Sequence, residues 1–224
     1  MTADQHTPLF PLVRHFSQRV TPLLAKLPIS ANQVTAASIV TGLASGWAMM
    51  QGTRTGALWG ALFLLVAYIF DNCDGEIARL KNQSSEFGRR FDCMADWVVH
   101  LVFFLALGVG VYRASGETLW LWLGAAAALG TSINTLVGYL IERRRKKAGV
   151  DEATGGGTEN GRQPVGAKEW ALFIFRELFR ADFCFIVLIL ALFDLTWLLL
   201  PVGAVGAQVY WAAQLIKGAD EFHV

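Results

Sequence analysis

Charged residues are scarce in this sequence, and their signs nearly cancel. Only 17% of its 224 residues are Asp, Glu, Lys or Arg, and the formal net charge is +1, whereas a soluble domain carries about 25% charged residues. This balance excludes a disordered or collagen-like chain and a basic nucleic-acid-binding domain, so no nucleic acid is expected as a partner. The three cysteines stand far apart in apolar surroundings, which excludes a disulfide framework and a cysteine metal site. We also expect no cleavable signal peptide from the first residues.

Apolar residues take the place of the missing charge. Hydrophobic residues make up 54% of the chain, and the mean hydropathy is +0.42. A membrane-spanning helix needs about 20 mostly apolar residues. Six stretches approach this length, namely residues 33–50, 56–70, 97–112, 119–141, 172–193 and 195–216. A membrane barrel would show alternating polarity, which these stretches lack, so we predict an all-α integral membrane protein with six transmembrane helices.

Polar extensions complete the two shortest stretches. Residues 71–79 follow the second stretch and residues 92–96 precede the third, and both stretches reach spanning length if these extensions are helical. Basic residues are dense before the first stretch, between the second and third, and after the fourth. By the positive-inside rule, both termini and the ends that carry the extensions face the cytoplasm. We expect the location to be a bacterial-type inner (plasma) membrane.

Three regions are expected along the chain. They are an N-terminal cytoplasmic segment (1–30), a six-helix membrane domain (31–217) and a C-terminal tail (218–224). Residues 9–27 mix apolar and basic side chains, which predicts an amphipathic helix on the membrane surface that Pro22 kinks or ends; a loosely ordered tail is the alternative. Gly42 and Gly46 could seat a neighbouring helix, and a homodimer contact is one use of such a pair.

Four aspartates stand in the two polar extensions. Asp71 and Asp74 are three residues apart, and Asp92 and Asp96 are four apart, so each pair lies on one face of its helix. Two such helices side by side would direct four carboxylates to one point. A charged residue at mid-membrane costs about 2.5–3.5 kcal/mol, so this cluster requires cations to offset it. Carboxylate oxygens select Mg²⁺, Ca²⁺ or Mn²⁺ over zinc.

Small and basic residues beside the aspartates indicate what binds there. Gly75 and Ala78 would let a ligand approach the backbone closely, and Arg79 offers a planar fork for phosphate oxygens. Together with the carboxylates, they describe a site for a pyrophosphate-linked substrate. Solvated charges at a helix end are the alternative, which would explain one aspartate but not the whole constellation.

The segment from Asp71 to Asp96 resembles the motif D-x2-D-G-x2-A-R-x8-G-x3-D-x3-D of the CDP-alcohol phosphotransferase family. All eight fixed positions match, at Asp71, Asp74, Gly75, Ala78, Arg79, Gly88, Asp92 and Asp96. Family members have six membrane helices, with the motif on the second and third. They move a substituted phosphate from a CDP-linked lipid to the hydroxyl of an acceptor alcohol and release CMP.

The resemblance implies a role for each matching residue. A pair of Mg²⁺ or Mn²⁺ ions would be held by Asp71, Asp74 and Asp92, with Asp96 also counted among the candidate ligands. Asp96 would be the general base that takes the proton of the acceptor hydroxyl. The cytidine nucleotide and its pyrophosphate would be held by Gly75, Ala78 and Arg79. These roles agree with the chemistry, because displacement at phosphorus needs charge stabilisation, which paired metals provide, and a positioned base.

Asn32 carries a weaker signal. The run from Ser30 to Thr35 resembles the Pro-Asn-x-x-Thr element at the start of this family's first helix, with Ala31 in place of the proline. Asn32 would then touch the nucleotide. The alternative is that Ser30 or Asn32 caps the helix N-terminus.

Arg176 and Arg180 are four residues apart, with Asp182 nearby. We expect them to receive an anionic acceptor, and the alternative is that they extend to the membrane interface. His100, one turn beyond Asp96, is interpreted as a packing residue, and a catalytic histidine is the alternative. The segment from Asp74 to Arg79 resembles the family branch that uses phosphorylated inositol or related polyols, which favours a phosphorylated polyol as the small polar acceptor.

Three other kinds of protein share some of these sequence features. A membrane transporter also uses intramembrane carboxylates, but it would spread them over several spans near the midplane. A membrane prenyltransferase would need a second aspartate-rich element and more helices. A non-catalytic scaffold is disfavoured by the complete set of aspartates.

Overall fold

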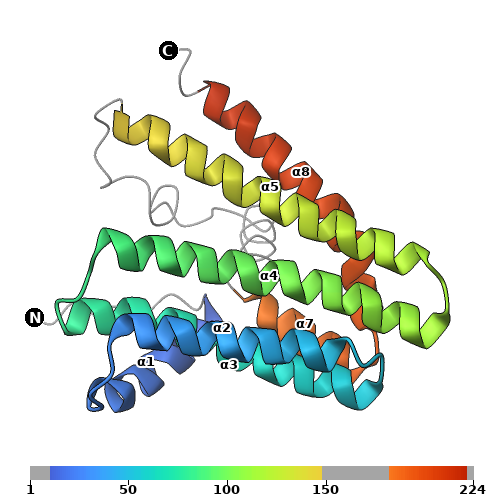
Figure 1. Ribbon diagram of the computed structural model, residues 1–224, viewed down its shortest axis with the longest axis horizontal. Helices are drawn as coiled ribbons and strands as arrows, with labels where there is room; N and C mark the ends of the chain where they lie inside the picture. Colours follow the sequence, from blue (N-terminus) through green and yellow to red (C-terminus); the bar gives the residue numbers. More distant parts are fainter. Residues whose placement is uncertain (1–10, 148–181, 221–224) are drawn as a thin grey trace, which may run out of the picture.

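The computed structural model describes residues 11–147 and 182–220, and within each of these two ranges short connections join the helices (Figure 1). In chain order these are α1 (Leu12–Ala25), α2 (Ala31–Met49), α3 (Arg54–Leu80), α4 (Glu86–Ser115), α5 (Leu119–Lys147), α7 (Phe183–Leu192), the 3₁₀ turn η2 (Thr196–Leu198) and α8 (Leu199–Asp220). No strand occurs within these two ranges. The all-α class predicted from the sequence is confirmed.

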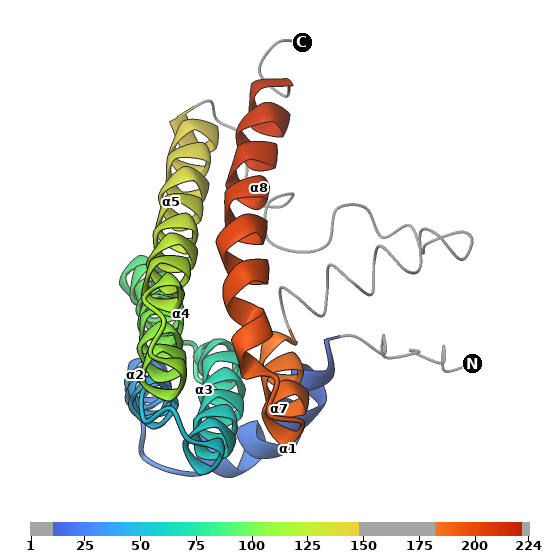
Figure 2. The same ribbon diagram turned by 90° about the vertical axis from the view of Figure 1, so that its right-hand side faces the viewer.

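The helices α2, α3 and α4 lie side by side, as Figure 1 shows. The helix α7 packs against α3, and α5 packs against both α4 and α8. The helices α5 and α8 extend together away from the other helices (Figure 2). The core lies where α3, α4 and α7 meet. Phe103 is fully buried there, and its ring centroid lies 5.4 Å from that of Phe104 and 5.6 Å from that of Phe183.

Three helices of the described part are long and apolar enough to cross a membrane: α3, α4 and residues Leu119–Arg144 of α5. In α3 and α4 the predicted polar extensions continue the apolar helix without a break. The prediction of six spans is confirmed only for these three. The helix α2 is 19 residues long and is not among these three helices; it buries hydroxyl side chains such as Ser38 and Ser45. The fifth predicted span lies largely outside the described residues, which include only α7 from it.

The two glycines Gly42 and Gly46 seat α4 of the same chain. A Cβ atom on Gly46 would lie 2.6 Å from a methyl group of Val102, and one on Gly42 would collide with Val99. Both glycines are buried. The neighbouring helix that this pair accommodates is therefore internal, and the homodimer contact considered from the sequence is not needed to explain it.

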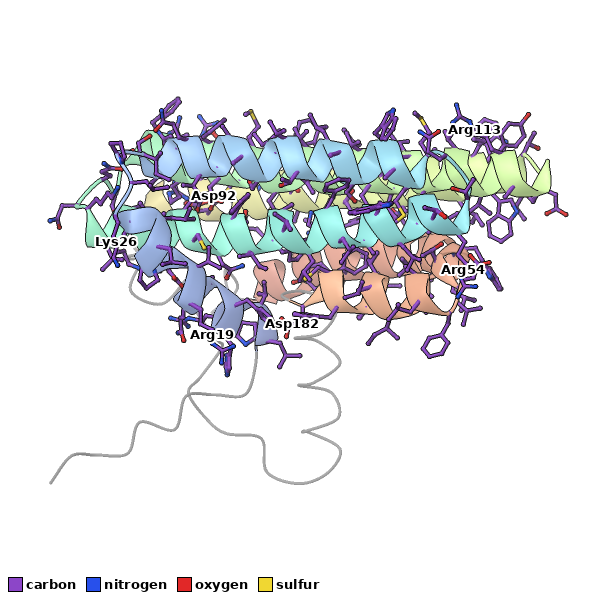
Figure 3. All side chains as sticks on the ribbon, turned by 90° about the horizontal axis from the view of Figure 1, so that it is seen from below. Arg19, Lys26, Arg54, Asp92, Arg113 and Asp182 are labelled. Atoms are coloured by element: carbon purple, nitrogen blue, oxygen red, sulfur yellow. The ribbon has the colours of Figure 1, made fainter. Side chains whose placement is uncertain are left out.

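The helix α1 crosses beside α3 at an angle (Figure 3) and is tied down at two places. At its N-terminus, the buried Asp182 accepts hydrogen bonds from the backbone N–H groups of Leu12 (2.7 Å) and Val13 (2.9 Å). Further along, two hydroxyl groups of α1 donate to the Glu76 carboxylate of α3, at 2.8 and 2.5 Å. Pro22 lies inside α1 and does not end it; the carbonyl group that it leaves unpaired belongs to an exposed turn, where water can reach it.

Candidate active site

Three of the four predicted aspartates converge at one end of the bundle. Asp71 and Asp74 lie near the C-terminal end of α3, and Asp92 lies in the second turn of α4; one carboxylate oxygen from each falls within 4.8 Å of the others. Asp74 is buried and the other two are partly buried. Figure 3 shows Asp92 at the same end as Lys26, opposite Arg54 and Arg113.

This donor set fits a hard divalent cation. Three carboxylates at this spacing repel one another unless a cation lies between them, and all their donor atoms are oxygens, which Mg²⁺ and Mn²⁺ prefer. The two helices supply the ligands from facing surfaces. The geometry therefore agrees with the spacing argument made from the sequence, for three residues of the four.

A threonine of α2 holds Asp74 in place. The Thr35 hydroxyl donates to Oδ2 of Asp74 at 2.5 Å, and both side chains are buried. The same hydroxyl lies 3.2 Å from the carbonyl oxygen of Ala31. A third helix thus fixes the orientation of a carboxylate that α3 supplies, and this role was not assigned to Thr35 from the sequence.

Asp96 lies one turn beyond Asp92 on α4, and it is not a member of the group of three. Its Oδ1 lies 3.1 Å from Nδ1 of His100. On the other side of the imidazole ring, Nε2 lies 2.8 Å from the hydroxyl oxygen of Tyr68 on α3. From the sequence, His100 was expected to be a packing residue, with a catalytic role as the alternative, and no role was predicted for Tyr68. The sequence holds one indication of a role for Tyr68, which is that this residue stands three positions before Asp71 and therefore on the same helix face.

A cavity of about 470 Å³ opens beside the carboxylates, between the ends of α2, α3 and α4. This volume lies within the range of small-molecule sites, about 300–1,000 Å³. Its lining includes every residue that the sequence analysis assigned to the nucleotide on these helices, together with two of the aspartates: Asn32, Gly75, Ala78, Arg79, Asp74 and Asp92. The other two candidates, Arg176 and Arg180, lie outside the described residues.

Two glycines of the motif lie against polar side chains of the cavity wall. A Cβ on Gly75 would lie 3.5 Å from Nη1 of Arg79, so the guanidinium group folds back over this glycine. A Cβ on Gly88 would lie 3.2 Å from both Oδ1 of Asn32 and Oγ of Ser85, which is too close for comfortable contact. Gly88 therefore lets the first turn of α4 approach Asn32.

The N-termini of α2 and α4 both border the cavity. Ser30 caps α2. Its side chain accepts a hydrogen bond from the backbone N–H of Gln33, and the Gln33 side chain accepts one from the backbone N–H of Ser30. Ser85 caps α4 by accepting from the backbone N–H of Gly88 at 3.0 Å. Ser30 is thus the cap, and Asn32 is left with its side chain in the cavity wall. Helix N-termini favour anions, because their free N–H groups and dipoles carry positive charge.

The remaining polar residues around the cavity hold its walls. Lys81 donates to the carbonyl oxygens of Leu27 and Ile29, both at 2.8 Å. Arg89 forms ion pairs with Glu86 and Glu142, so it links α4 to α5. Arg79 forms no ion pair with any described residue, and it is the arginine of the cavity wall that is available to an anionic ligand.

Fold and site together define a helical membrane protein with an acidic cation-binding group beside a ligand-sized cavity. The family model of CDP-alcohol phosphatidyltransferases matches residues 28–215, so the chain belongs to this family. The resemblance drawn from the motif is confirmed. The chain is also similar to the bifunctional IPC transferase and DIPP synthase of Thermococcus kodakarensis, with 31% identity over 134 residues. That match covers 60% of this chain and 28% of the relative, so the chain spans a minor part of the relative's length.

Proposed function

We propose that this protein transfers a substituted phosphate group from a CDP-linked lipid, such as CDP-diacylglycerol, to the hydroxyl of a small polar acceptor. The observation that carries the proposal is that Asp74 and Asp92 border the same cavity as Asn32 and Arg79. A cation-binding group and an anion-binding wall thus share one space. Residues 31–217 would form the catalytic domain, which agrees closely with the family match to residues 28–215.

The reaction makes one bond to phosphorus and breaks another. The acceptor oxygen bonds to the phosphorus that carries the lipid, the bond from that phosphorus to the oxygen bridging to CMP breaks, and CMP leaves with the electron pair. Asp96 takes the proton of the acceptor hydroxyl. Oδ1 of Asp96 contacts His100, while no described residue donates to Oδ2, which leaves that oxygen for the acceptor. A positioned base of this kind contributes about 10²–10⁴-fold.

The group of Asp71, Asp74 and Asp92 would hold Mg²⁺ or Mn²⁺, and we propose a pair of ions. The cations would neutralise charge on the pyrophosphate oxygens of the donor. Thr35 orients Asp74 for this purpose. Arg79 and the N-terminal ends of α2 and α4 would face the remaining phosphate charge.

We propose a phosphorylated polyol as the acceptor. The segment from Asp74 to Arg79 resembles the branch of the family that uses such acceptors. Arg176 and Arg180 would bind its phosphate, although Asp182 is engaged elsewhere, on the N-terminus of α1. The relative from Thermococcus kodakarensis is named a transferase and a synthase, and we take from it only support for the transferase class.

Exposed tryptophans support a membrane interface at the end of the bundle opposite the aspartates, and the basic connections favour the cytoplasm for the end that carries the site. Trp and Tyr gather at membrane interfaces. Four tryptophans between 40% and 73% exposed lie near the connections at the end of the bundle opposite the aspartates: Trp47, Trp59, Trp122 and Trp197. With the apolar helices α3, α4 and α5 between the two ends, the lipid tail of the donor could stay in the bilayer while CMP leaves to water.

The test is CMP release by the purified full chain in nanodiscs. CDP-diacylglycerol is supplied with a phosphorylated polyol, a free polyol, glycerol phosphate or serine, each with Mg²⁺, Mn²⁺ or a chelator. We expect metal-dependent CMP release that is fastest with the phosphorylated polyol. Asp74→Asn should abolish it, while the same change at Asp194, a residue outside the site with a φ of 61° that asparagine tolerates, should not.

No CMP release with any acceptor and either metal would refute the proposal. Cation movement into sealed proteoliposomes that contain the protein, without CMP release, would instead favour the transporter.

A further inference from the structure

We propose that Tyr68 and His100 are positioning residues that hold Asp96 in the orientation a general base needs. This inference rests on the proposed function, and it assigns roles to two residues outside the family motif. Its starting point is that the Asp96 side chain is 60% exposed. An exposed carboxylate on a helix changes rotamer freely unless another group holds it.

His100 supplies that hold from the next turn of α4. Its Nδ1 lies 3.1 Å from Oδ1 of Asp96 and 2.8 Å from the backbone oxygen of the same residue. Both of these atoms are acceptors, so Nδ1 carries a proton and donates. One nitrogen thus ties the side chain of Asp96 to its own backbone and restricts its rotation.

The imidazole ring is itself held by two other helices. Nε2 lies 2.8 Å from the hydroxyl oxygen of Tyr68 on α3, and the Tyr68 residue is buried. The ring centroid of Phe183 on α7 lies 6.1 Å from that of His100. The ring is therefore fixed by a hydrogen bond at one end and by an aromatic neighbour on α7, which is more than a packing histidine needs.

The held carboxylate borders the metal ligands. A small cavity of about 10 Å³ is lined by Ser38, Tyr68, Asp71 and Asp96. This is roughly the space that one water-sized group requires. Asp96 and Asp71 therefore line the same small space, which is next to the group of metal-binding carboxylates. The series of contacts from Tyr68 through His100 thus ends at Asp96, beside the cation site. A displacement of this base by about 1 Å can lower the rate roughly 10²-fold.

The test compares two His100 variants of similar size, one with a hydrogen-bond donor at the Nδ1 position and one without; both lack Nε2 and its contact with Tyr68. In His100→Asn the amide nitrogen stands where Nδ1 stands, because both are bonded to Cγ, whereas His100→Leu has no donor. We expect kcat to fall about 10- to 100-fold in the leucine variant, as for other supporting partners of site residues, with KM for the CDP-lipid and the Mg²⁺ requirement little changed. The asparagine variant should recover most of the loss, and Tyr68→Phe should lose less than His100→Leu.

A double variant shows whether His100 acts through Asp96. In an Asp96→Asn background, His100→Leu should cost about twofold or less, because the group that it positions no longer works as a base. The role is overturned if the leucine variant keeps wild-type kcat, if asparagine does no better than leucine, or if the loss appears in KM for the CDP-lipid. A wild-type protein that releases no CMP refutes the proposed function and this role with it, whereas an active wild type with unresponsive His100 variants refutes this role alone.

Discussion

Removing the Thr35 hydroxyl should weaken the metal site without touching a metal ligand. Thr35 and Asp74 are 2% and 5% exposed, and their hydrogen bond is 2.5 Å long. A hydrogen bond to a charged group contributes about 1.5–3 kcal/mol, which corresponds to roughly 10- to 150-fold in affinity if all of it appears in metal binding. Outer partners of metal ligands contribute about 10- to 100-fold, so the two ranges agree.

The matched variants are Thr35→Val, which keeps the shape of the side chain, and Thr35→Ser, which keeps the hydroxyl. We expect the Mg²⁺ concentration for half-maximal CMP release to rise about 10- to 100-fold in the valine variant and to change little in the serine variant. Thermal unfolding in chelator checks that both variants fold. Equal Mg²⁺ requirements in wild type and the valine variant would show that Thr35 does not support the site.

Two further substitutions test the walls of the site. Gly88→Ala should raise KM for the CDP-lipid several-fold, because the new Cβ would press on Asn32. The control is Gly138→Ala, which should leave KM unchanged because no heavy atom lies within 4 Å of the new Cβ. Equal KM values in both variants would show that Asn32 does not contribute to binding of the CDP-lipid. Asp182→Ala should lower the free energy of unfolding by about 1–3 kcal/mol, because two backbone N–H groups of α1 lose their acceptor; unchanged unfolding would show that Asp182 does not anchor α1.

The arrangement of the aspartates was predictable from the sequence because it depends on local geometry. Spacings of three and four residues fix the helix face that each carboxylate occupies. The structure brings Asp71, Asp74 and Asp92 together as expected. The helical character of the polar extensions followed from the same reasoning, since a broken helix would have left both spans too short.

The contacts between distant segments were not predictable. The bonds from Thr35 to Asp74 and from Asp182 to the start of α1 join residues 39 and about 170 positions apart, and nothing in a local pattern specifies such a partner. The effect of Pro22 on α1 was not predictable either, because it depends on whether water reaches the carbonyl group that the proline leaves unpaired.

The binding of CDP with and without a divalent cation tests the central claim most directly. Calorimetric titration of the full chain in nanodiscs should show that Mg²⁺ tightens CDP binding at least about tenfold, because Asp71, Asp74 and Asp92 repel the pyrophosphate without it. Asp92→Asn should lose this gain, and Asp96→Asn should retain it. CDP affinity that is unchanged by complete chelation, or a larger loss of Mg²⁺ dependence in Asp96→Asn than in Asp92→Asn, would contradict the assignment of these aspartates.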